Sequence, residues 1–287
     1  MNIKIGPAGT TMAFNLNKEN KMINYPKYIA SFSLNAFEYQ CGNGVRISEQ
    51  SAKIFGQECK NNKITVSIHA PYYISLSSVE SQKRDNSIKY ILQTSKVASA
   101  MGAKRIVIHS GSCAKMSRLD ALNFAVDTLN RSLKVLKDNN LEDIIICPEV
   151  MGKTNQLGCV EEVVKLSKLG DNVIPCIDFG HLNARLFGKL KSKEDYNKLF
   201  SFIENELGNY KMKNIHIHFS KIEYSVPGGE KRHLTFEDTI YGPEFEPLAE
   251  ILIQKSCTPI IICESAGTQI EDALTMMYFF LRECTNR

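Results

Sequence analysis

Short apolar runs alternate along the chain with longer segments in which apolar residues recur every three or four positions. The short runs are almost continuously hydrophobic, which is typical of parallel strands covered on both faces. We predict eight such strands, at residues 2–6, 35–40, 64–70, 104–110, 143–149, 172–178, 213–219 and 258–264. The helical spacing predicts helices over residues 84–102, 117–140, 160–170, 192–208, 245–256 and 269–284.

Strands that alternate with helices in this way favour a closed (β/α)8 TIM barrel, with a doubly wound open sheet as the alternative. Local signals agree with the helix starts, since Ser117 stands at an N-cap position with Asp120 three residues later. The sequence shows no linker rich in proline, glycine or serine and no shift in composition. We therefore expect one TIM-barrel domain over residues 1–287.

Composition narrows the class of protein. Hydrophobic residues make up 43% of the 287 positions, enough for a large core, and the formal net charge is only +4. The nine cysteines form no C-x-x-C pair, which indicates a reducing, cytoplasmic environment. The N-terminus has no apolar signal-peptide region, and no stretch approaches the roughly 20 apolar residues that span a bilayer. We expect a cytoplasmic monomer without membrane contact.

Six consecutive predicted strands end in a side chain that can bind a metal or move a proton. These residues are His69, His109, Glu149, Asp178, His218 and Glu264. In a barrel, such positions converge on the carboxyl-terminal face, where active sites lie. Imidazoles and carboxylates together suit zinc, manganese or iron, and the clustered carboxylates would repel one another without a cation. Two neighbouring divalent ions would suit a displacement at phosphorus.

Simpler interpretations exist for each residue taken alone. A histidine at a strand end is commonly a hydrogen-bonded structural residue, and a terminal Asp or Glu often caps the next helix. With His181 and His233 added, however, the pattern involves five of the six histidines. The sixth, His216, lies one layer deeper on the same strand face as His218, and we predict a packed or hydrogen-bonded core histidine there.

Several short motifs together resemble the endonuclease IV family of apurinic/apyrimidinic endonucleases, which are zinc-dependent (β/α)8 barrels. The motifs run over most of the chain in the order and spacing of that family. They are IHAPYYISL (68–76), IHSGS (108–112), PEVMGKTNQLG (148–158), CIDFGH (176–181), HFSKIEY (218–224) and CESAG (263–267).

The resemblance implies a role for each of the candidate residues. His69, His109 and Glu149 match the first zinc site of the family. Glu149 would bridge to a second site, and we expect Glu149 and Glu264 to serve catalysis. The remaining ligands of the second site would be Asp178, His218 and Glu264, and those of the third site His181 and His233.

Two further positions are candidates for contact with DNA. Tyr72 falls where the family places a DNA-contacting side chain, although it would also fit an ordinary half-exposed tyrosine. Arg46, in the loop after the second predicted strand, is a candidate for a phosphate contact. Exposed arginines in loops, however, usually make no specific contact.

One departure from the family concerns the third metal site. The family has an aspartate two residues before the position of His233, and this chain has Lys231 there. Lysine ammonium is not a zinc ligand. We therefore expect two tightly bound zinc ions and a weak or absent third, unless a shift of the loop brings in the adjacent Glu230.

The resemblance implies a metal-dependent phosphodiesterase that acts on DNA containing abasic sites. The expected activity is that of an AP endonuclease of the deoxyribonuclease IV type, which cleaves 5′ to the lesion in base excision repair. One alternative is a sugar isomerase or epimerase of the xylose-isomerase type, which needs one metal and a compact pocket. The other is a non-catalytic barrel that binds damaged DNA, which would not need a bridging Glu149.

Overall fold

The computed structural model describes residues 3–226 and 228–285, and its strands follow the predicted order. Each predicted strand is present but shorter than expected, and the first was predicted to begin at Asn2, which lies outside the described residues. The eight strands are β1 (Lys4–Pro7), β2 (Ala36–Gln40), β3 (Thr65–His69), β4 (Arg105–Ile108), β5 (Ile145–Pro148), β6 (Cys176–Asp178), β7 (His216–Phe219) and β10 (Ile260–Cys263).

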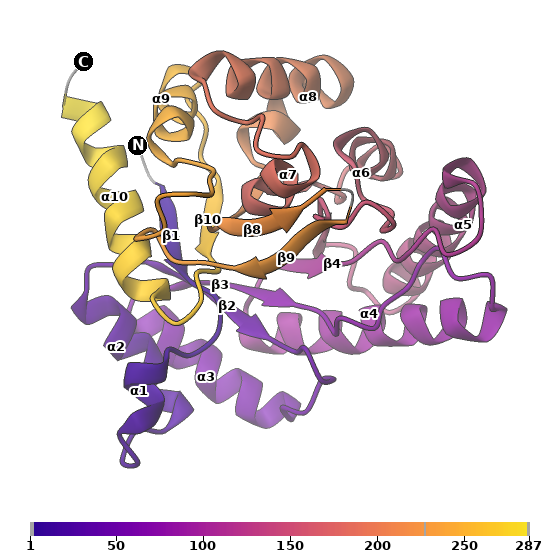
Figure 1. Ribbon diagram of the computed structural model, residues 1–287. Coiled ribbons are helices and arrows are strands. Elements are labelled where there is room, and N and C mark those ends of the chain that lie inside the picture. The colour runs from indigo at the N-terminus through magenta and orange to yellow at the C-terminus, as the bar shows by residue number, and fades with distance from the viewer. Residues whose placement is uncertain (1–2, 227, 286–287) are drawn as a thin grey trace.

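These strands close into a barrel (Figure 1). One set pairs in parallel in the order β2-β3-β4-β5 and the other in the order β1-β10-β7-β6. Parallel bridges join the two sets, Ile146 with Val173 and Glu149 with Cys176 on one side, and Ala8 with Glu38 on the other. The prediction of a TIM barrel is confirmed, and the open-sheet alternative is wrong.

The predicted helices are also present, within a few residues of their expected ends. They are α4 (Ser81–Met101), α5 (Arg118–Asp138), α6 (Val160–Ser167), α8 (Lys193–Lys213), α9 (Glu246–Gln254) and α10 (Gln269–Thr285). Ser117 caps α5 as predicted, accepting a hydrogen bond from the backbone N–H of Asp120. The prediction that the fourth of these helices ends at Gly208 is partly right. Gly208 is non-helical (φ 80°, ψ 165°), but a further helical segment follows it within α8.

Several further elements were not predicted, because they carry few apolar residues in a regular pattern. They are α1 (Met12–Leu16), a 3₁₀ helix (Met22–Asn24), α2 (Tyr25–Ser31), α3 (Glu49–Asn61), α7 (Phe179–Arg185), β8 (Ile222–Ser225) and β9 (Gly229–His233). In α3 only three of thirteen residues are buried. The β8–β9 hairpin is inserted after β7 and lies across the barrel (Figure 1), and Ile222 and Gly229 are the buried residues of its two strands.

The barrel strands separate two kinds of interior. Seven of them turn a fully buried isoleucine toward the helices, namely Ile5, Ile68, Ile106, Ile146, Ile177, Ile217 and Ile261. The opposite side chains point into the barrel and are mostly smaller, among them Ser67, Val107, Cys147 and Cys176. A barrel of eight strands has an interior just wide enough for such side chains to fill. The interior layer therefore supports the polar strand ends above it.

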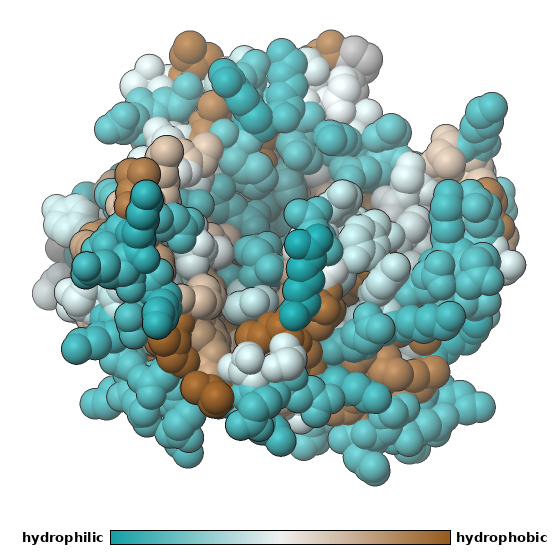
Figure 2. Space-filling view, turned by 90° about the horizontal axis from the view of Figure 1, so that it is seen from below, coloured by the Kyte–Doolittle hydropathy of each residue, from teal (hydrophilic) through white to brown (hydrophobic). Residues whose placement is uncertain are grey.

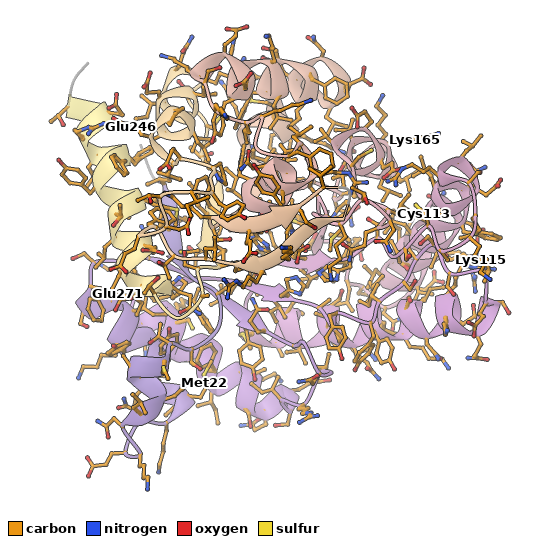
Figure 3. All side chains as sticks on the ribbon, in the orientation of Figure 1. Met22, Cys113, Lys115, Lys165, Glu246 and Glu271 are labelled. Atoms are coloured by element: carbon orange, nitrogen blue, oxygen red, sulfur yellow. The ribbon has the colours of Figure 1, made fainter. Side chains whose placement is uncertain are left out.

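Polar side chains dominate the outside. Lys165 on α6 and Glu246 on α9 lie in the outer layer of helices (Figure 3). Hydrophilic residues cover most of the face in Figure 2, and the hydrophobic ones there form small, separate patches. Among the described residues, no helix combines the length and the hydrophobicity needed to cross a membrane.

Candidate metal centre

The predicted strand-end residues meet in one cleft at the carboxyl ends of the barrel strands. The cleft has a volume of about 340 Å³. Its lining residues are His69, Tyr72, His109, Glu149, Met151, Lys153, Gln156, His181, Glu230, His233 and Glu264. Asp178 and His218, the two remaining predicted ligands, are fully buried beneath it. The structure thus brings all eight predicted ligands together.

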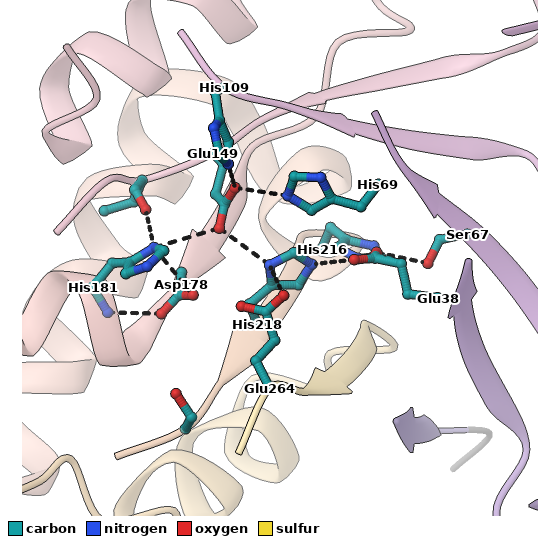
Figure 4. Close-up of polar contacts among 12 residues, drawn as sticks. Glu38, Ser67, His69, His109, Glu149, Asp178, His181, His216, His218 and Glu264 are labelled. Carbon is teal, nitrogen blue, oxygen red and sulfur yellow. Dashed lines mark hydrogen bonds and ion pairs between the residues drawn. The ribbon is translucent and has the colours of Figure 1, made fainter. Parts of the chain in front are cut away.

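Glu149 lies at the centre of the cluster, with 1% of its surface exposed (Figure 4). One carboxylate oxygen, Oε2, is 3.3 Å from His69 Nε2 and 3.2 Å from His109 Nε2. The other, Oε1, is 3.2 Å from His218 Nδ1 and 3.4 Å from His181 Nδ1. One side chain therefore contacts imidazoles from four different βα units.

The ligand atoms fall into two sets that share Glu149. Within each set the ligand atoms lie within 4.8 Å of one another. The first set is His69, His109 and Glu149, and the second is Glu149, Asp178, His218 and Glu264. In the described part of the chain, no lysine or arginine forms an ion pair with these carboxylates. The donor types, and carboxylates that are paired with imidazoles alone, therefore fit divalent cations.

The imidazoles are held in defined orientations by neighbouring acceptors. The Nδ1–H of His69 donates to the Ala70 carbonyl at 2.8 Å, and that of His181 donates to the Val150 carbonyl at 3.1 Å. His233 Nδ1 is hydrogen-bonded to Ser220 Oγ at 2.8 Å. A carbonyl can only accept, so Nδ1 of His69 and of His181 carries a proton, and Nε2 is the nitrogen that would bind a metal after losing its own proton. Such contacts orient metal-binding histidines and raise their basicity.

Asp178 combines the two interpretations that the sequence left open. Its Oδ1 accepts the backbone N–H of His181 at 2.7 Å and so caps α7. Its Oδ2 is buried and lies 3.2 Å from His181 Nδ1, within the second ligand set. The cap fixes the carboxylate at the strand end while leaving one oxygen directed into the cluster.

A third set contains a carboxylate, so the expectation that it lacks one is wrong, and the alternative in which Glu230 joins the set is the arrangement present. His181, Glu230 and His233 offer ligand atoms within 4.8 Å of one another, and Glu230 Oε2 is 3.5 Å from His181 Nε2. Lys231 instead pairs with Glu223 at 3.2 Å, away from the cleft.

A β-bulge explains this exchange of residues. In the β8–β9 ladder, Glu223 pairs with Arg232 and Tyr224 pairs with Glu230, so Lys231 is an extra residue without a partner in the ladder. In a regular strand, Lys231 would face the same side as His233. One extra residue reverses the alternation and places Glu230 on that face. The sequence E-K-R-H therefore presents the same pair of ligand types as a regular Asp-x-His.

A buried network lies directly below His218. The fully buried Glu38 approaches His218 Nε2 and His216 Nε2, each at 3.0 Å, and accepts a hydrogen bond of 2.8 Å from Ser67 Oγ (Figure 4). His216 is thus a hydrogen-bonded core histidine, as predicted. Cys176, His216 and His218 also offer ligand atoms within 4.8 Å of one another. Because Glu38 already partners both imidazoles, we assign this cluster to the orientation of His218, whose Nδ1 then faces Glu149.

The charges of the cluster depend on one another. Burial alone would raise the pKa of Glu149, but the hydrogen bonds from His109, His181, His218 and His69 hold it well below its usual range. Burial lowers the pKa of His69, yet contact with Glu149 raises it to about 9. Without a cation, protons on the imidazoles balance the carboxylates. Bound divalent ions would take the place of those protons.

The two predicted DNA-contacting residues differ in position. Tyr72 lines the cleft and is 59% exposed, so its ring is free to meet a ligand. Arg46 is exposed in the segment after β2 but is not part of the cleft lining. Met151, Lys153 and Gln156, which sequence reasoning missed, line the cleft from the loop after β5.

Two arginines hold this loop in place. Arg185 donates to the carbonyls of Met151 and Lys153, both at 2.9 Å. Arg118 donates to the carbonyls of Thr154 and Gln156 at 3.0 and 3.1 Å and pairs with Glu162. The rim of the cleft is therefore a fixed structure.

Comparison with known proteins places this fold in a family. The sequence matches the xylose isomerase-like TIM barrel family over residues 26–282. The chain belongs to that family. An uncharacterized protein of Methanocaldococcus jannaschii is 34% identical over 248 residues, which cover 86% of this chain and 88% of that one. A probable endonuclease 4 of Mycoplasma pneumoniae is 28% identical over 204 residues, which cover 68% of this chain and 65% of that protein.

Solved structures share this fold at low sequence identity. Endonuclease IV from Thermus thermophilus has a TM-score of 0.68 at 15% identity and is covered completely. A D-tagatose 3-epimerase-like protein has a TM-score of 0.71 at 19% identity, with 99% of this chain and 98% of that one covered. The resemblance to the endonuclease IV family is confirmed by the sequence relatives, while the fold itself is shared with sugar epimerases.

Proposed function

We propose that this protein is a zinc-dependent endodeoxyribonuclease that cleaves DNA 5′ to abasic sites in base excision repair. The observation that carries the proposal is the contact of Glu149 with four imidazoles, which joins two ligand sets beside a third. Neighbouring cations suit a phosphodiester, because both the attacking and the leaving oxygen need charge neutralisation. The relatives named probable endonuclease 4 support this choice over other hydrolases.

The three sets identify which residues would hold the ions. Glu149 would hold the first pair together, and Glu230, His181 and His233 would complete the third position at the rim. Bound ions would supply Lewis-acid activation of water and neutralise charge on the phosphate. The protein contributes fixed ligand geometry, since backbone carbonyls set the tautomers of His69 and His181. The same ligands also suit manganese or iron.

Residues around the cleft would position the nucleic acid. The exposed ring of Tyr72 offers a stacking surface for a base next to the lesion. Lys153 at the rim, and Arg46 farther out, would contact backbone phosphates. An abasic nucleotide leaves the helix at lower cost than a paired one, because its pairing is already lost. The cleft would thus select the lesion partly through its ease of extrusion.

We also propose a cytoplasmic location and a monomeric state for this protein. All nine cysteines are free. Free thiols are typical of reducing compartments, which supports a cytoplasmic location. The three ligand sets are complete within one chain, so a single-domain monomer would suffice for the proposed activity.

A sugar epimerase is the second candidate, supported by the TM-score of 0.71 with the D-tagatose 3-epimerase-like protein. An epimerase of this kind would use one ion in a closed sugar pocket. A third ligand set on the inserted hairpin, at the rim, has no evident use in that reaction. This set therefore favours the phosphodiester substrate.

The test measures metal content and two activities on the same preparation. The protein as purified is analysed for bound metal and incubated with an end-labelled duplex that contains one abasic site, with an intact duplex as control. A single cut 5′ to the lesion, lost on treatment with a chelator, is expected. Epimerisation of a ketohexose without DNA cleavage would contradict the proposal, as would binding of the duplex without any cleavage by the metal-loaded protein.

A further inference from the structure

The opposite end of the barrel contains a second, larger cavity of about 720 Å³. It opens at the amino ends of four strands, since Lys4, Thr65, Arg105 and Ile260 are the first residues of β1, β3, β4 and β10 and all line it. Helix α3 and the end of α4 form its outer wall. Its volume lies within the range of small-ligand sites. The amino ends of barrel strands usually serve stability, so a cavity of this size calls for a separate explanation.

Every charged side chain that lines this cavity is cationic. The lining contains six cationic side chains and no aspartate or glutamate. The six are Lys4, Lys53, Lys60, Lys63, Lys104 and Arg105. Within the described part of the chain, none of the six forms an ion pair. The C-terminal ends of α3 and α4 lie here, but each offers only about half a negative charge. A net charge of about +5 therefore remains without a partner.

Arg105 is the buried member of these six cations. Only 8% of its surface is exposed, yet it lines the cavity. Its one described hydrogen bond runs from Nη1 to the Ile215 carbonyl at 3.3 Å. A guanidinium has five N–H donors, and buried arginines are seldom left without an acidic partner. The remaining donors of Arg105 are therefore available to an anion that enters the cavity.

We propose that this cavity binds a small anion with two or three linked phosphate groups. Such an anion carries a charge of about −3 to −5, which matches the uncompensated positive charge. A planar guanidinium forms paired hydrogen bonds with phosphate, and lysines add mobile point charges around it. The lining has no aromatic side chain on which bases could stack, so a nucleic-acid strand fits less well. The site is independent of the candidate metal centre, which lies at the other ends of the strands.

Calorimetric titration with inorganic tripolyphosphate tests the proposal, with the protein as purified and at low ionic strength. The test variant is Lys60→Glu/Lys63→Glu, and the matched control is Lys134→Glu/Lys137→Glu. Both pairs are exposed, and Lys60 and Lys137 each lie in the last turn of a helix. Binding should weaken at least about tenfold in the test pair and less than about threefold in the control.

A milder variant addresses the buried cation. Arg105→Lys keeps the charge but loses the planar guanidinium, so it should weaken tripolyphosphate binding. If this variant does not fold, the two lysine-pair variants still test the site. Four results would overturn the proposal. Three of them come from these titrations. They are no binding by the wild type, an equal loss in both lysine pairs, and a loss that follows Glu149→Ala instead, which would place the anion at the metal centre. Competition by a single-stranded oligonucleotide, with the same loss in the test pair, would overturn it in favour of a nucleic-acid site.

Discussion

The two ends of one barrel differ in how their charged side chains are paired. Strand β4 shows this within five residues, since Arg105 begins it in the basic cavity, Val107 lies in the apolar layer, and His109 follows its end in the metal cleft. At the carboxyl end, imidazoles and carboxylates contact one another. At the amino end, the cations have no acidic partner among the described residues.

This difference predicts how each end responds to change. Buried, mutually paired groups lose several interactions at once when one member is removed, so the effects are large and coupled. Exposed like charges are screened by solvent and salt, so single substitutions have small effects on stability. Substitutions at the carboxyl end should therefore have large effects, whereas substitutions at the amino end should alter ligand binding without loss of the fold.

The largest effect is expected at the residue shared by two ligand sets. Glu149→Ala should remove the bound metal of both sets and lower DNA cleavage about a thousandfold or more, equivalent to about 4 kcal/mol. Metal analysis per chain and a cleavage assay measure this. Lys60→Glu/Lys63→Glu, at the other end, should keep full metal content. Retention of all metal by Glu149→Ala would show that the proposed centre is wrong.

The bulge in β9 predicts the next effect. Glu230→Ala should lower the metal content by one equivalent, because Glu230 supplies the only carboxylate of the third set. Lys231→Ala should leave the content unchanged, because Lys231 pairs with Glu223 outside the cleft. Metal content after dialysis distinguishes the two variants. If Lys231→Ala lost the metal and Glu230→Ala kept it, the assignment made from the bulge would be reversed.

A smaller effect is expected below the centre, at Glu38. Glu38→Gln keeps the shape of the side chain but removes the charge that orients His218. Loss of such a partner typically lowers metal affinity about 10–100-fold. Competition with a chromophoric chelator measures this affinity, and Ser67→Ala, which removes a neutral partner of the same carboxylate, serves as control. Equal affinity in Glu38→Gln and wild type would show that Glu38 only fills space.

These cases separate what the sequence could predict from what it could not. His69, His109 and Glu149 were found because apolar runs end there and barrel strand ends must converge. Glu230 could not be assigned, because its orientation depends on one extra residue in a polar hairpin without hydrophobic periodicity. Glu38 was visible as an acid inside a predicted strand, but its partners lie on β3 and β7, and only the closed barrel brings them together.

The basic cavity could not be predicted from the sequence for a related reason. Its cations come from strand starts, from α3 and from the segments next to them, up to about 100 residues apart in the chain, so no local run of charge marks them. The net charge of +4 is too small to suggest a concentrated patch. Only the arrangement in space reveals it.

A pH-dependent effect is expected at the rim, where Glu162 holds the loop after β5. Burial would raise the pKa of Glu162, but Arg118 and the backbone N–H groups of Gly158 and Cys159 lower it. A lowered pKa in the folded state stabilises the protein above the unfolded value of about 4.3, and this stability is lost as the pH falls through the folded pKa.

The variant Glu162→Gln isolates that contribution. It should lower the free energy of unfolding by about 1–3 kcal/mol at neutral pH, allowing for the partly exposed Arg118. Below a pH of about 4.3 the difference between the variant and the wild type should shrink. Denaturant unfolding at several pH values measures both. A difference that stays constant with pH would assign the effect to packing of the side chain.

The smallest effect has the opposite sign and lies in the basic cavity. Lys63 follows the end of α3 with φ 59°, a left-handed conformation that favours glycine. Lys63→Gly should therefore raise the free energy of unfolding by about 0.5–1 kcal/mol and also weaken tripolyphosphate binding. Lys60→Gly, inside the last turn of α3, should lower the free energy of unfolding by about the same amount. It should weaken tripolyphosphate binding to a similar extent. If both variants bind tripolyphosphate as the wild type does, the lysine at position 63 has no role in the cavity, and its left-handed conformation carries a cost without a matching function.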